Sequence, residues 1–580
     1  METIRVDVLV VGAGPAGLTA ALTLASQGVQ VMAISKYLGT AHNPRAHITN
    51  QRTIEVFRDL GIEDRIRAVG FPLSYLNHNV LATSFAGLEI ARYRSYGTEP
   101  DRLSEYAVAS PCPPINCQQH VMEPVLLAAA RERGADVRYY HQLVHIEQTP
   151  DEVRARVLDR HTNAEFMVHA RYAIGADGSR STVAEQLDFR FLGEAGLRNM
   201  ATSWLEVDLT KYCEHRPGVL YWIGRPGHEQ WFGTATWACV KPFTEWLLLH
   251  PWGLSDAPPT EEAVLAKARL TIQDPDIPIR VKGIATWQVN NVVAAEYRKG
   301  RVFLAGDAAH RHPPAGGLGT NTSVQDSFGL AWKLAFVLKG KAGEALLDSY
   351  SEERQPIGAH VVHRANVSFK NTAALVEALG FTEGQSEEDG WAAINELYSD
   401  APGAAGRREK LTAAIKLQDY RSNALGVDLG QRYTSRAIVA EPTPFLEPEG
   451  DPELHYRPTT HPGAPMPHAW IEHERKTLSM LDITGHGRFS LLVGVGGESW
   501  KAAAAEVAAE LDIELPAFAI GLRCEYDDVT GDWAAAREVS DRGAILVRPD
   551  RFIAWRSMGP SQAPVDELRA ALHRVLARPT

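Results

Sequence analysis

A strand, a glycine-rich turn, a helix and a second strand at the very start of the chain constrain its fold more than any other feature. Val6–Val11 is a short apolar run suited to a buried parallel strand. The turn G-A-G-P-A-G follows at once, then a helical pattern up to Gly28 and a strand over Val29–Ile34. In this β-α-β order the glycines let a pyrophosphate approach the backbone at a helix N-terminus. The pattern predicts a dinucleotide site, with the pyrophosphate held by Gly12, Gly14, Pro15, Ala16 and Gly17.

The end of the second strand departs from this pattern. An Asp or Glu usually stands there and binds the ribose hydroxyls of the adenosine. Here the place holds Ser35, followed by Lys36. A neutral hydroxyl binds a ribose more weakly than a carboxylate does. We therefore expect a weakened ribose contact at Ser35 and Lys36.

Two further motifs lie far down the chain. Tyr172–Ser181 reads as a strand that ends in a D-G turn, and Arg301–His310 as a strand that ends in G-D. A glycine-rich loop over Pro313–Asn321 then leads into a helix predicted over Thr322–Leu338. Asp307 of the G-D turn is suited to accept hydrogen bonds from a polyol beside a phosphate. The N–H groups of the loop are suited to bind an electron-rich ring edge or developing negative charge.

Together the three motifs resemble the single-component flavin aromatic hydroxylases, also called class A flavin monooxygenases, over about residues 1–370. Within that family, the segment P-R-A-H-I-T-N-Q-R-T at Pro44–Thr53 is most similar to the phenol and chlorophenol hydroxylases, and the long C-terminal extension points to the same branch. The resemblance implies FAD as cofactor, with NADPH or NADH and O2 as co-substrates. It also implies hydroxylation of a phenol-like ring, ortho to its hydroxyl, through a flavin C4a-hydroperoxide.

The same resemblance assigns cofactor-binding roles. Arg45 would lie near the pyrophosphate or the nicotinamide donor, and Gln118 would contact FAD. Asp177 and Arg180 would serve both FAD and NAD(P)H, and Asp307 would bind the ribitol chain. The G-D turn and the loop after it would contribute Gly306, Pro314, Gly317, Leu318, Gly319 and Asn321.

Several of these residues have a purely structural alternative. Asp177 and Asp307 could do no more than cap helices. Gln118 could be a surface residue, and Arg45 could form a structural ion pair.

His47 is the candidate catalytic base or phenol partner, because it falls where related phenol hydroxylases place an aspartate in a similar segment. A histidine with a pKa of about 6.5 can accept a proton at neutral pH, and a phenolate is a better nucleophile than a phenol. The alternative is a histidine bonded to the backbone beside the flavin. His310 and His312 have no third ligand nearby in sequence, so no metal is expected.

A region of alternating strands separates the D-G and G-D motifs. The predicted strands are Thr202–Leu209, Gly218–Ile223, Gln230–Val240 and Gly283–Val289. The family builds the roof of its substrate pocket from this sheet, and planar side chains can stack on a ring. No arginine clamp for a substrate carboxylate is identifiable, which favours a neutral chlorophenol, alkylphenol, hydroxypyridine or polyketide-derived phenol. The residues expected to face the substrate are Tyr221, Trp222, Trp287 and Pro314, whereas Trp231, Phe232 and Trp237 are expected in the core.

The C-terminal part changes composition twice. The stretch 441–469 carries eight of the 34 prolines and reads as an extended linker. Beyond it the predicted order βαβ…ββα is that of a thioredoxin-like fold, but no C-x-x-C is present and Cys524 stands alone. We therefore expect a structural or dimerising role for this part.

The predicted fold class is α/β: a Rossmann-like FAD-binding domain interleaved with a mixed β-sheet substrate domain. The FAD-binding domain is expected over 1–75, 105–185 and 290–370, and the substrate domain over 76–104 and 186–289. A helical connection with the proline-rich linker is expected over 371–468, and the thioredoxin-like domain over 469–580.

Composition excludes other classes of protein. The net charge of −12, without any run of five Lys or Arg, argues against a nucleic-acid partner. No apolar stretch approaches 18 residues, so no membrane span is expected. The five cysteines without a C-x-x-C pair favour a reducing, cytoplasmic compartment. We expect a homo-oligomer that acts on a small aromatic substrate. The alternatives are another FAD-dependent enzyme such as a halogenase, a plain dehydrogenase, or a non-catalytic flavin-binding homologue.

Overall fold

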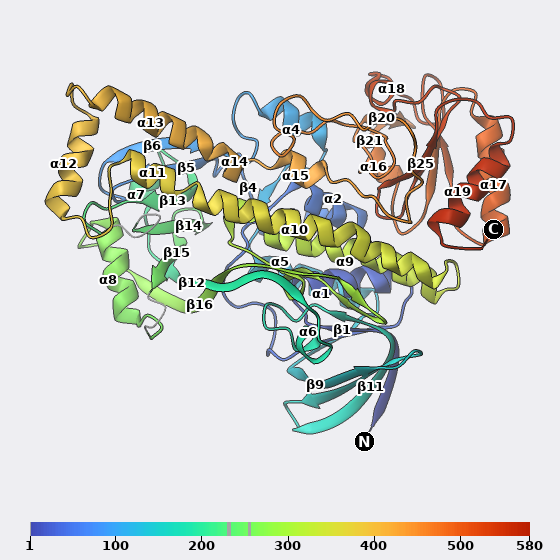
Figure 1. Cartoon of the computed structure of the whole chain (residues 1–580), viewed down its shortest axis with the longest axis horizontal. Coiled ribbons are helices and arrows are strands. Elements are labelled where there is room, and N and C mark those ends of the chain that lie inside the picture. Colours follow the sequence, from blue (N-terminus) through green and yellow to red (C-terminus); the bar gives the residue numbers. More distant parts are fainter. Residues whose placement is uncertain (1, 229–233, 253–256, 580) are drawn as a thin grey trace.

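The predicted β-α-β unit stands at the centre of the first sheet. The computed structural model describes residues 2–228, 234–252 and 257–579 (Figure 1). The unit is formed by β1 (Thr3–Val11), α1 (Pro15–Ser26) and β2 (Val31–Ser35). β1 pairs in parallel with β2 on one side and with β11 (Ala164–Gly175) on the other. Because the three strands run the same way, the glycine-rich turn and the D-G motif meet at one edge of the sheet.

The G-D motif reaches the same edge from much later in the chain. β18 (Val302–Leu304) pairs in parallel with β11, and β8 (Asp136–Tyr139) with β2, within an eight-stranded sheet. The remaining strands of this sheet are β9 (His141–Gln148), β10 (Val153–Asp159) and β17 (Arg298–Lys299). The D-G motif at Tyr172–Ser181 and the G-D motif at Arg301–His310 therefore become neighbours, although about 130 residues separate them.

The helix after the G-D motif begins earlier than predicted. α9 runs over Leu318–Leu338, whereas the sequence predicted Thr322 as its first residue. Gly317 is its N-cap with a φ of +69°, a left-handed conformation that glycine adopts without strain. Glycine and threonine are weak helix formers, so propensity alone placed the start too late. The end of the expected loop thus forms the first turn of the helix.

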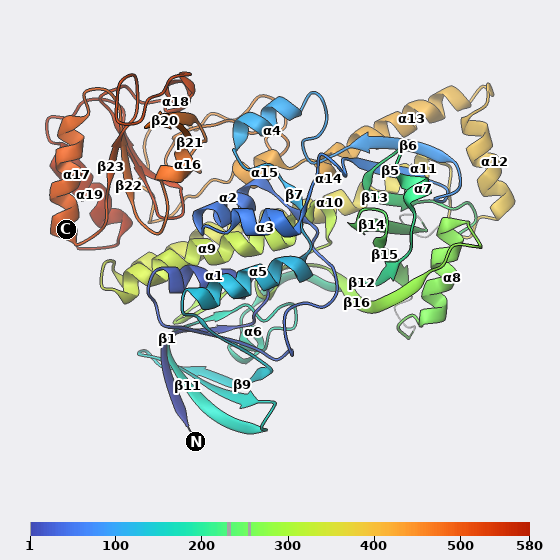
Figure 2. The same ribbon diagram turned by 180° about the vertical axis from the view of Figure 1, so that it is seen from behind.

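Among the described residues the second sheet also has eight strands, in the order β19-β16-β12-β15-β14-β13-β5-β6. Its two longest strands, β12 (Phe191–Glu206) and β16 (Arg280–Ala294), link the two sheet regions in both views (Figures 1 and 2). Two predicted strands, Thr202–Leu209 and Gly283–Val289, fall on these two, although β12 ends at Glu206. Residues 230–233 of another prediction, with Trp231 and Phe232, lie outside the described residues. The other strands are β5 (His78–Ala82), β6 (Glu89–Arg94), β13 (Gly218–Ile223), β14 (Ala235–Lys241), β15 (Glu245–Trp252) and β19 (His310–Arg311).

The helical segment expected as a mere connection is part of the second sheet's core. Leu375, Leu379 and Leu411 belong to the same buried cluster as Trp237 of β14. Their alanine-rich surroundings gave no clear apolar periodicity, which is why the sequence did not reveal this packing. The helices are α10 (Asp348–Lys370), α11 (Ala373–Ala378), α12 (Glu387–Leu397), α13 (Ala404–Leu417), α14 (Asp419–Ser422) and α15 (Leu425–Leu429).

The proline-rich stretch is less free than a linker. Residues 430–469 contain no helix or strand among those described, yet 459–469 are buried throughout. After it the elements follow in the order predicted, and the likeness to thioredoxin stays a prediction. The second strand of that order, β23, is short and spans Ala517–Ala519. The sheet has the order β23-β22-β24-β25 and is built from β22 (Ser490–Val493), α17 (Glu498–Leu511), β23 (Ala517–Ala519), β24 (Ala544–Val547), β25 (Ile553–Ser557) and α19 (Pro564–Val575).

Shorter elements complete the three regions. Across the described part of the chain, no helix is both long and apolar enough to cross a bilayer. Those used below are β3 (Ile48–Thr49), α2 (Gln51–Asp59), β7 (Ile115–Asn116), α5 (Gln119–Glu132), α6 (Thr182–Gln186), η1 (Gly306–Ala308) and η2 (Ala315–Gly317). The C-terminal region also holds β20 (Trp470–His473), β21 (Lys476–Ser479), α16 (Met480–Ile483) and α18 (Asp532–Ala536), which were not predicted.

Candidate active site

The glycines of the first turn have two distinct tasks. A Cβ on Gly12 would lie 2.0 Å from the carbonyl oxygen of Ala176, and one on Gly17 would lie 1.9 Å from that of Gly12. These two glycines therefore allow the backbone to close on itself. A Cβ on Gly14 would meet nothing nearer than a Glu123 oxygen at 3.8 Å, so this side of the turn is open. Since α1 begins here at Pro15, an anion at the open side would face free N–H groups.

Asp177 of the D-G motif caps a helix. Its carboxylate accepts hydrogen bonds from the Ser181 hydroxyl at 2.5 Å and from the Val183 N–H at 3.2 Å, at the start of α6. The capping alternative is thus the observed geometry. The motif still supports the dinucleotide turn, because the backbone of residues 176–177 packs against Gly12. Arg180 is exposed beside it.

Asp307 of the G-D motif has the opposite environment. It is exposed, and no described residue donates a hydrogen bond to its carboxylate. The turn that carries it is anchored from behind by Asp326, which accepts from Gly306 N at 3.1 Å, His310 Nε2 at 2.9 Å and Arg354 Nε at 2.8 Å. A fixed turn with a free carboxylate is what a polyol chain requires. The sequence did not single out Asp326, which lies inside α9 among other buried residues.

The glycine-rich loop brings the segment after Pro44 close to the G-D turn. Asn321 accepts a hydrogen bond from Asn50 N at 3.0 Å and donates to the carbonyl oxygens of Ile48 at 2.9 Å and Gly317 at 2.6 Å. Its amide is fully used by the protein, so Asn321 positions this segment. A Cβ on Gly317 would lie 2.9 Å from Ile48, which requires glycine there.

The other predicted ring contacts divide into open and buried positions. Pro314 is exposed, and Gly316 is half-buried with a left-handed φ of +79°. Gly319 faces the ring of His312, 3.5 Å from an added Cβ. Leu318 is only 3% exposed and belongs to a separate apolar cluster with Val361 and its neighbours. Leu318 therefore supports the loop from within the core.

His47 lies one residue before Ile48, beside this loop. Its carbonyl oxygen accepts from Cys117 N at 2.7 Å, while its ring Nε2 is buried and has no hydrogen-bond partner among the described residues. Burial, assisted by the positive charge of Arg421, lowers the pKa of His47 to about 4. The ring is therefore neutral at neutral pH and presents an unused polar atom.

A polar chain leads from Arg45 to the dinucleotide turn. Arg45 Nε donates to Gln119 Oε1 at 2.7 Å, and Gln119 Nε2 donates to Glu123 Oε1 at 2.5 Å. Glu123 also accepts from Ala41 N at 2.5 Å, and burial raises its pKa. Arg45 is thus bound to an amide and not to a carboxylate, unlike the structural ion pair considered as an alternative. The spacing of four residues that places Gln119 and Glu123 on one face of α5 was a signal in the sequence.

Gln118, the predicted FAD contact, faces the other way. It is 2% exposed, and its Nε2 donates to Asn116 Oδ1 at 2.9 Å and to Val240 O at 3.2 Å. The Gln118 side chain therefore links α5 to the second sheet, whereas the Gln119 side chain faces the dinucleotide turn. Ser35 is buried at the end of β2, where its hydroxyl accepts from Tyr37 N at 3.4 Å, with Lys36 half-buried next to it.

The three predicted aromatic substrate contacts have different surroundings. Tyr221 is 0% exposed and donates to Arg216 O at 2.7 Å, so it belongs to the core of the sheet. Trp287 is half-buried, donates to Thr202 Oγ1 at 2.9 Å and belongs to a small cluster with Ala315 of the glycine-rich loop. Trp222 lies 4.3 Å from the guanidinium of Arg421, and its indole N–H has no hydrogen-bond partner among the described residues.

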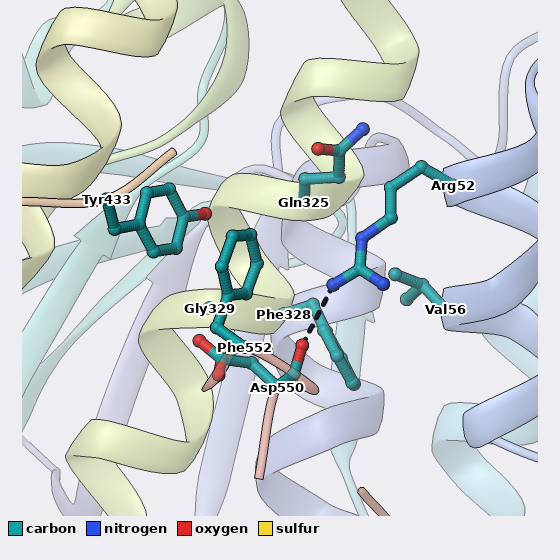
Figure 3. Close-up of a pocket in the computed structure, with 8 residues that line it drawn as sticks. All are labelled: Arg52, Val56, Gln325, Phe328, Gly329, Tyr433, Asp550 and Phe552. Atoms are coloured by element: carbon teal, nitrogen blue, oxygen red, sulfur yellow. Dashed lines mark hydrogen bonds between the residues drawn. The ribbon is translucent and has the colours of Figure 1, made fainter. Parts of the chain in front are cut away.

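One small cavity lies next to this arrangement and another lies away from it. One of about 20 Å³ lies beside Trp222 and Thr372 and is lined mainly by apolar groups. The other, of about 10 Å³, lies where the C-terminal region meets α2 and α9, and there Arg52 donates to the carbonyl oxygen of Asp550 at 2.8 Å (Figure 3). About 10 Å³ holds no more than one water molecule, so this second cavity is a packing feature of the interface.

Comparison with known proteins identifies the family. Residues 5–365 match the family described as FAD binding domain, and residues 459–579 match "Aromatic-ring hydroxylase, C-terminal". The chain is 42% identical over 577 residues to 2,4-dichlorophenol 6-monooxygenase of Delftia acidovorans, covering 99% of this chain and 98% of that protein. The chain belongs to the phenol hydroxylase-like branch of the class A flavin monooxygenases.

Two further relatives extend the likeness of this class A monooxygenase. Phenol 2-monooxygenase of Pseudomonas sp. (strain EST1001) is 38% identical, over 99% of this chain and 93% of that protein. The crystal structure of the flavin-dependent monooxygenase PieE in complex with FAD and substrate has a TM-score of 0.97 and 44% identity, covering 100% of both chains. The predicted fold class and enzyme class are confirmed: this is an FAD-dependent aromatic hydroxylase, with NAD(P)H and O2 as co-substrates and a small aromatic substrate.

Proposed function

We propose that this monooxygenase hydroxylates a phenol-like ring, ortho to its hydroxyl, between the glycine-rich loop and the aromatic sheet. The observation that carries the proposal is the buried Nε2 atom of His47, which lacks a partner among the described residues and lies next to the Ile48–Gly317 contact. A phenol hydroxyl is a donor that satisfies such an atom. Relatives named for phenol and 2,4-dichlorophenol support the same substrate class.

The described residues fit FAD at the edge where the three motifs meet. We assign the pyrophosphate to the turn Gly12–Gly17, the ribitol chain to Asp307 and the ring edge to the loop Pro314–Gly319. When bound, FAD supplies the hydride and oxygen chemistry. The chain itself binds and orients the aromatic ring, excludes water and holds the phenol hydroxyl at His47 Nε2.

In this proposal His47 acts mainly as a hydrogen-bond acceptor, and less as a general base that takes up the proton. Burial and Arg421 lower its pKa to about 4, so the imidazolium form is disfavoured. A neutral imidazole can accept a hydrogen bond from the phenol hydroxyl. This bond orients the hydroxyl and polarises its O–H bond without full transfer of the proton. Trp287, beside Ala315, would provide a planar wall for the ring.

A panel of substrates tests the substrate class. Chlorophenols, alkylphenols, hydroxypyridines and polyketide-derived phenols should each be scored for NAD(P)H consumption and for the structure of the product. We expect at least one phenol to stimulate consumption and to yield the ortho-dihydroxy product. A panel in which no phenol is hydroxylated would contradict the proposal.

Replacing His47 with Ala tests the role of this residue. We expect hydroxylated product per NAD(P)H to fall about tenfold or more, within the range typical of an acid–base group, while the FAD content stays that of the wild type. His145→Ala, an exposed histidine on β9, is the matched control. Equal coupling in both variants would remove His47 from the mechanism.

We also propose that the enzyme works as a homo-oligomer in a reducing, cytoplasmic setting. The five cysteines are free and four of them are buried, which supports the reducing compartment. The C-terminal region, for which we keep the thioredoxin-like comparison, would then be structural. Light scattering of the FAD-loaded protein tests this proposal, and a monomer at micromolar concentration would refute the oligomer.

A further inference from the structure

Arg421 places a guanidinium beside the proposed ring site, although the sequence assigned its segment to a connection. Helix α14, which carries it, lies against the glycine-rich loop: a Cβ on Gly316 would be 3.4 Å from the carbonyl oxygen of Arg421. The guanidinium lies 4.3 Å from the ring of Trp222. Its charge also acts on His47. Three segments far apart in sequence therefore converge on this one cation.

Among the described residues no carboxylate pairs with Arg421. Its guanidinium donates to the Thr372 hydroxyl at 3.2 Å, and burial lowers its pKa. The nearest acid on its own helix, Asp419, is bound by Arg102 at 2.9 Å and by Asn423 at 2.5 Å. An arginine keeps its charge in any protein environment, so the site holds an uncompensated positive charge.

The titratable groups that face Arg421 are neutral. Burial raises the pKa of Tyr96 to about 12 and raises that of Tyr93 further. Burial lowers the pKa of His47 to about 4. At neutral pH none of these groups supplies the missing negative charge.

The arginines that are buried more completely than Arg421 all have a carboxylate partner. A buried ion without a counter-charge is costly, and breaking such a pair destabilises a protein strongly. Each arginine that is fully buried in the described chain pairs with a carboxylate, and these are Arg52, Arg102, Arg216, Arg354, Arg364, Arg548, Arg551 and Arg556. Arg421 instead is half-buried and keeps accessible surface. Its guanidinium lies over the ring of Trp222 and its charge acts on His47, and the Nε1 and Nε2 atoms of these two rings have no hydrogen-bond partner among the described residues.

We propose that Arg421 is a substrate-recognition residue that binds a negatively charged oxygen on the aromatic ring, either an ionised phenol or a ring carboxylate. The inference rests on the proposed function, since it requires the ring to bind beside the glycine-rich loop. It replaces the expectation from the sequence that no arginine clamp exists and that a neutral substrate is favoured. A guanidinium forms strong charge-assisted hydrogen bonds to such an oxygen. A ring carboxylate on Arg421 leaves the phenol hydroxyl on His47, whereas an ionised phenol would give its oxygen to Arg421 in place of that contact.

Ligand binding to the oxidised, FAD-loaded enzyme tests the inference without turnover. Changes in flavin absorbance would report dissociation constants for phenols of graded acidity, for their methyl ethers, and for benzoates against benzamides. For the wild type we expect the anion to bind about tenfold or more tightly than its neutral partner, in proportion to its ionised fraction. The phenol series and the benzoate series distinguish the two sources of charge.

Variants then assign the preference to Arg421. Arg421→Met should abolish the preference for the anion and Arg421→Lys should keep part of it, with the FAD content unchanged. Lys410→Met, which removes an exposed charge on α13, is the control and should behave like the wild type. If the wild type binds ether and phenolate equally, the inference fails whether or not any variant folds. An anion preference that survives Arg421→Met would also overturn it. Absence of hydroxylation with intact anion binding would instead count against the proposed function alone.

Discussion

Two regions of this monooxygenase withdraw positive charge fully or partly from solvent, and the charge has different partners in each. At the interface of the C-terminal region with α9 and α10, Lys333 and Arg548 both bind Glu353 at 2.6 Å, and Arg548 also binds Asp550 at 2.5 Å. Burial alone would raise the pKa of Glu353, but Arg548 and Lys333 lower it to about 2. Beside the glycine-rich loop, Arg421 has no such partner among the described residues.

The difference distinguishes charged groups that stabilise the fold from charged groups that are available to bind a ligand. A satisfied buried network fixes one arrangement of the elements around it, which suits an interface. A buried charge that lacks hydrogen-bond or ionic partners lowers the stability of the protein. Such a charge is retained where a bound molecule supplies the missing partner. Charge balance therefore distinguishes the two regions better than the presence of a cavity does. The interface, too, has a cavity, of about 10 Å³, which is lined by Arg52 and Asp550 (Figure 3).

The largest expected effect comes from breaking the balanced network. Glu353→Gln leaves Lys333 and Arg548 facing each other without their shared carboxylate. We expect the free energy of unfolding to fall by about 3–5 kcal/mol, the cost typical of removing one partner of a buried pair. Denaturant unfolding of the FAD-loaded protein measures it. Glu352→Gln, at the half-buried neighbour that binds Arg436, is the control. A loss below about 1 kcal/mol would show that the interface does not depend on this network.

A smaller effect is expected at Asp326, the buried carboxylate behind the G-D turn of the flavin site. Asp326→Asn removes the carboxylate that anchors Gly306, His310 and Arg354 behind the G-D turn. With the turn loosened, we expect FAD affinity to fall by about 3 kcal/mol, or roughly a hundredfold, mostly through faster release. Titration of the apoprotein with FAD measures this change. Tight FAD binding by the variant would mean that the turn is held by other contacts.

The smallest effect concerns a lone buried acid near the site. Burial raises the pKa of Asp428 to about 7, against the hydrogen bond at 2.6 Å from Asn50. Between about pH 4, where the unfolded chain loses this proton, and about pH 7, where the folded chain does, stability should fall as pH rises. We therefore expect the wild type to lose about 2 kcal/mol relative to Asp428→Asn between about pH 5 and pH 8. Asp400→Asn, an exposed control, should follow the wild type, and parallel pH curves for all three proteins would contradict the assignment.

The fold and the FAD motifs were predictable because each is a continuous pattern. The first turn, the D-G motif and the G-D motif all follow buried parallel strands, and such strands bring their carboxyl ends together. The start of α9 was missed because Gly317 in a left-handed conformation begins a helix where propensity predicts a loop.

The site itself was predictable only in part, because tertiary packing completes it. His47 came from the resemblance, and its pKa depends on Arg421, which is 374 positions away in the sequence. Gln118 and Gln119 are adjacent, yet a step of one residue turns a helical side chain by about 100°, so only Gln119 faces the dinucleotide turn. Tyr221 was chosen for its aromatic ring, although the pairing of its strand directs it into the core.

The central claim is that this site inserts oxygen into a phenol. Incubating the FAD-loaded enzyme with NAD(P)H, a phenol and ¹⁸O-labelled O2 tests it most directly. We predict one ¹⁸O atom in each molecule of ortho-dihydroxy product and nearly one product per NAD(P)H oxidised. Consumption of NAD(P)H that yields only hydrogen peroxide for every phenol of the panel, or a product without the label, would contradict the claim.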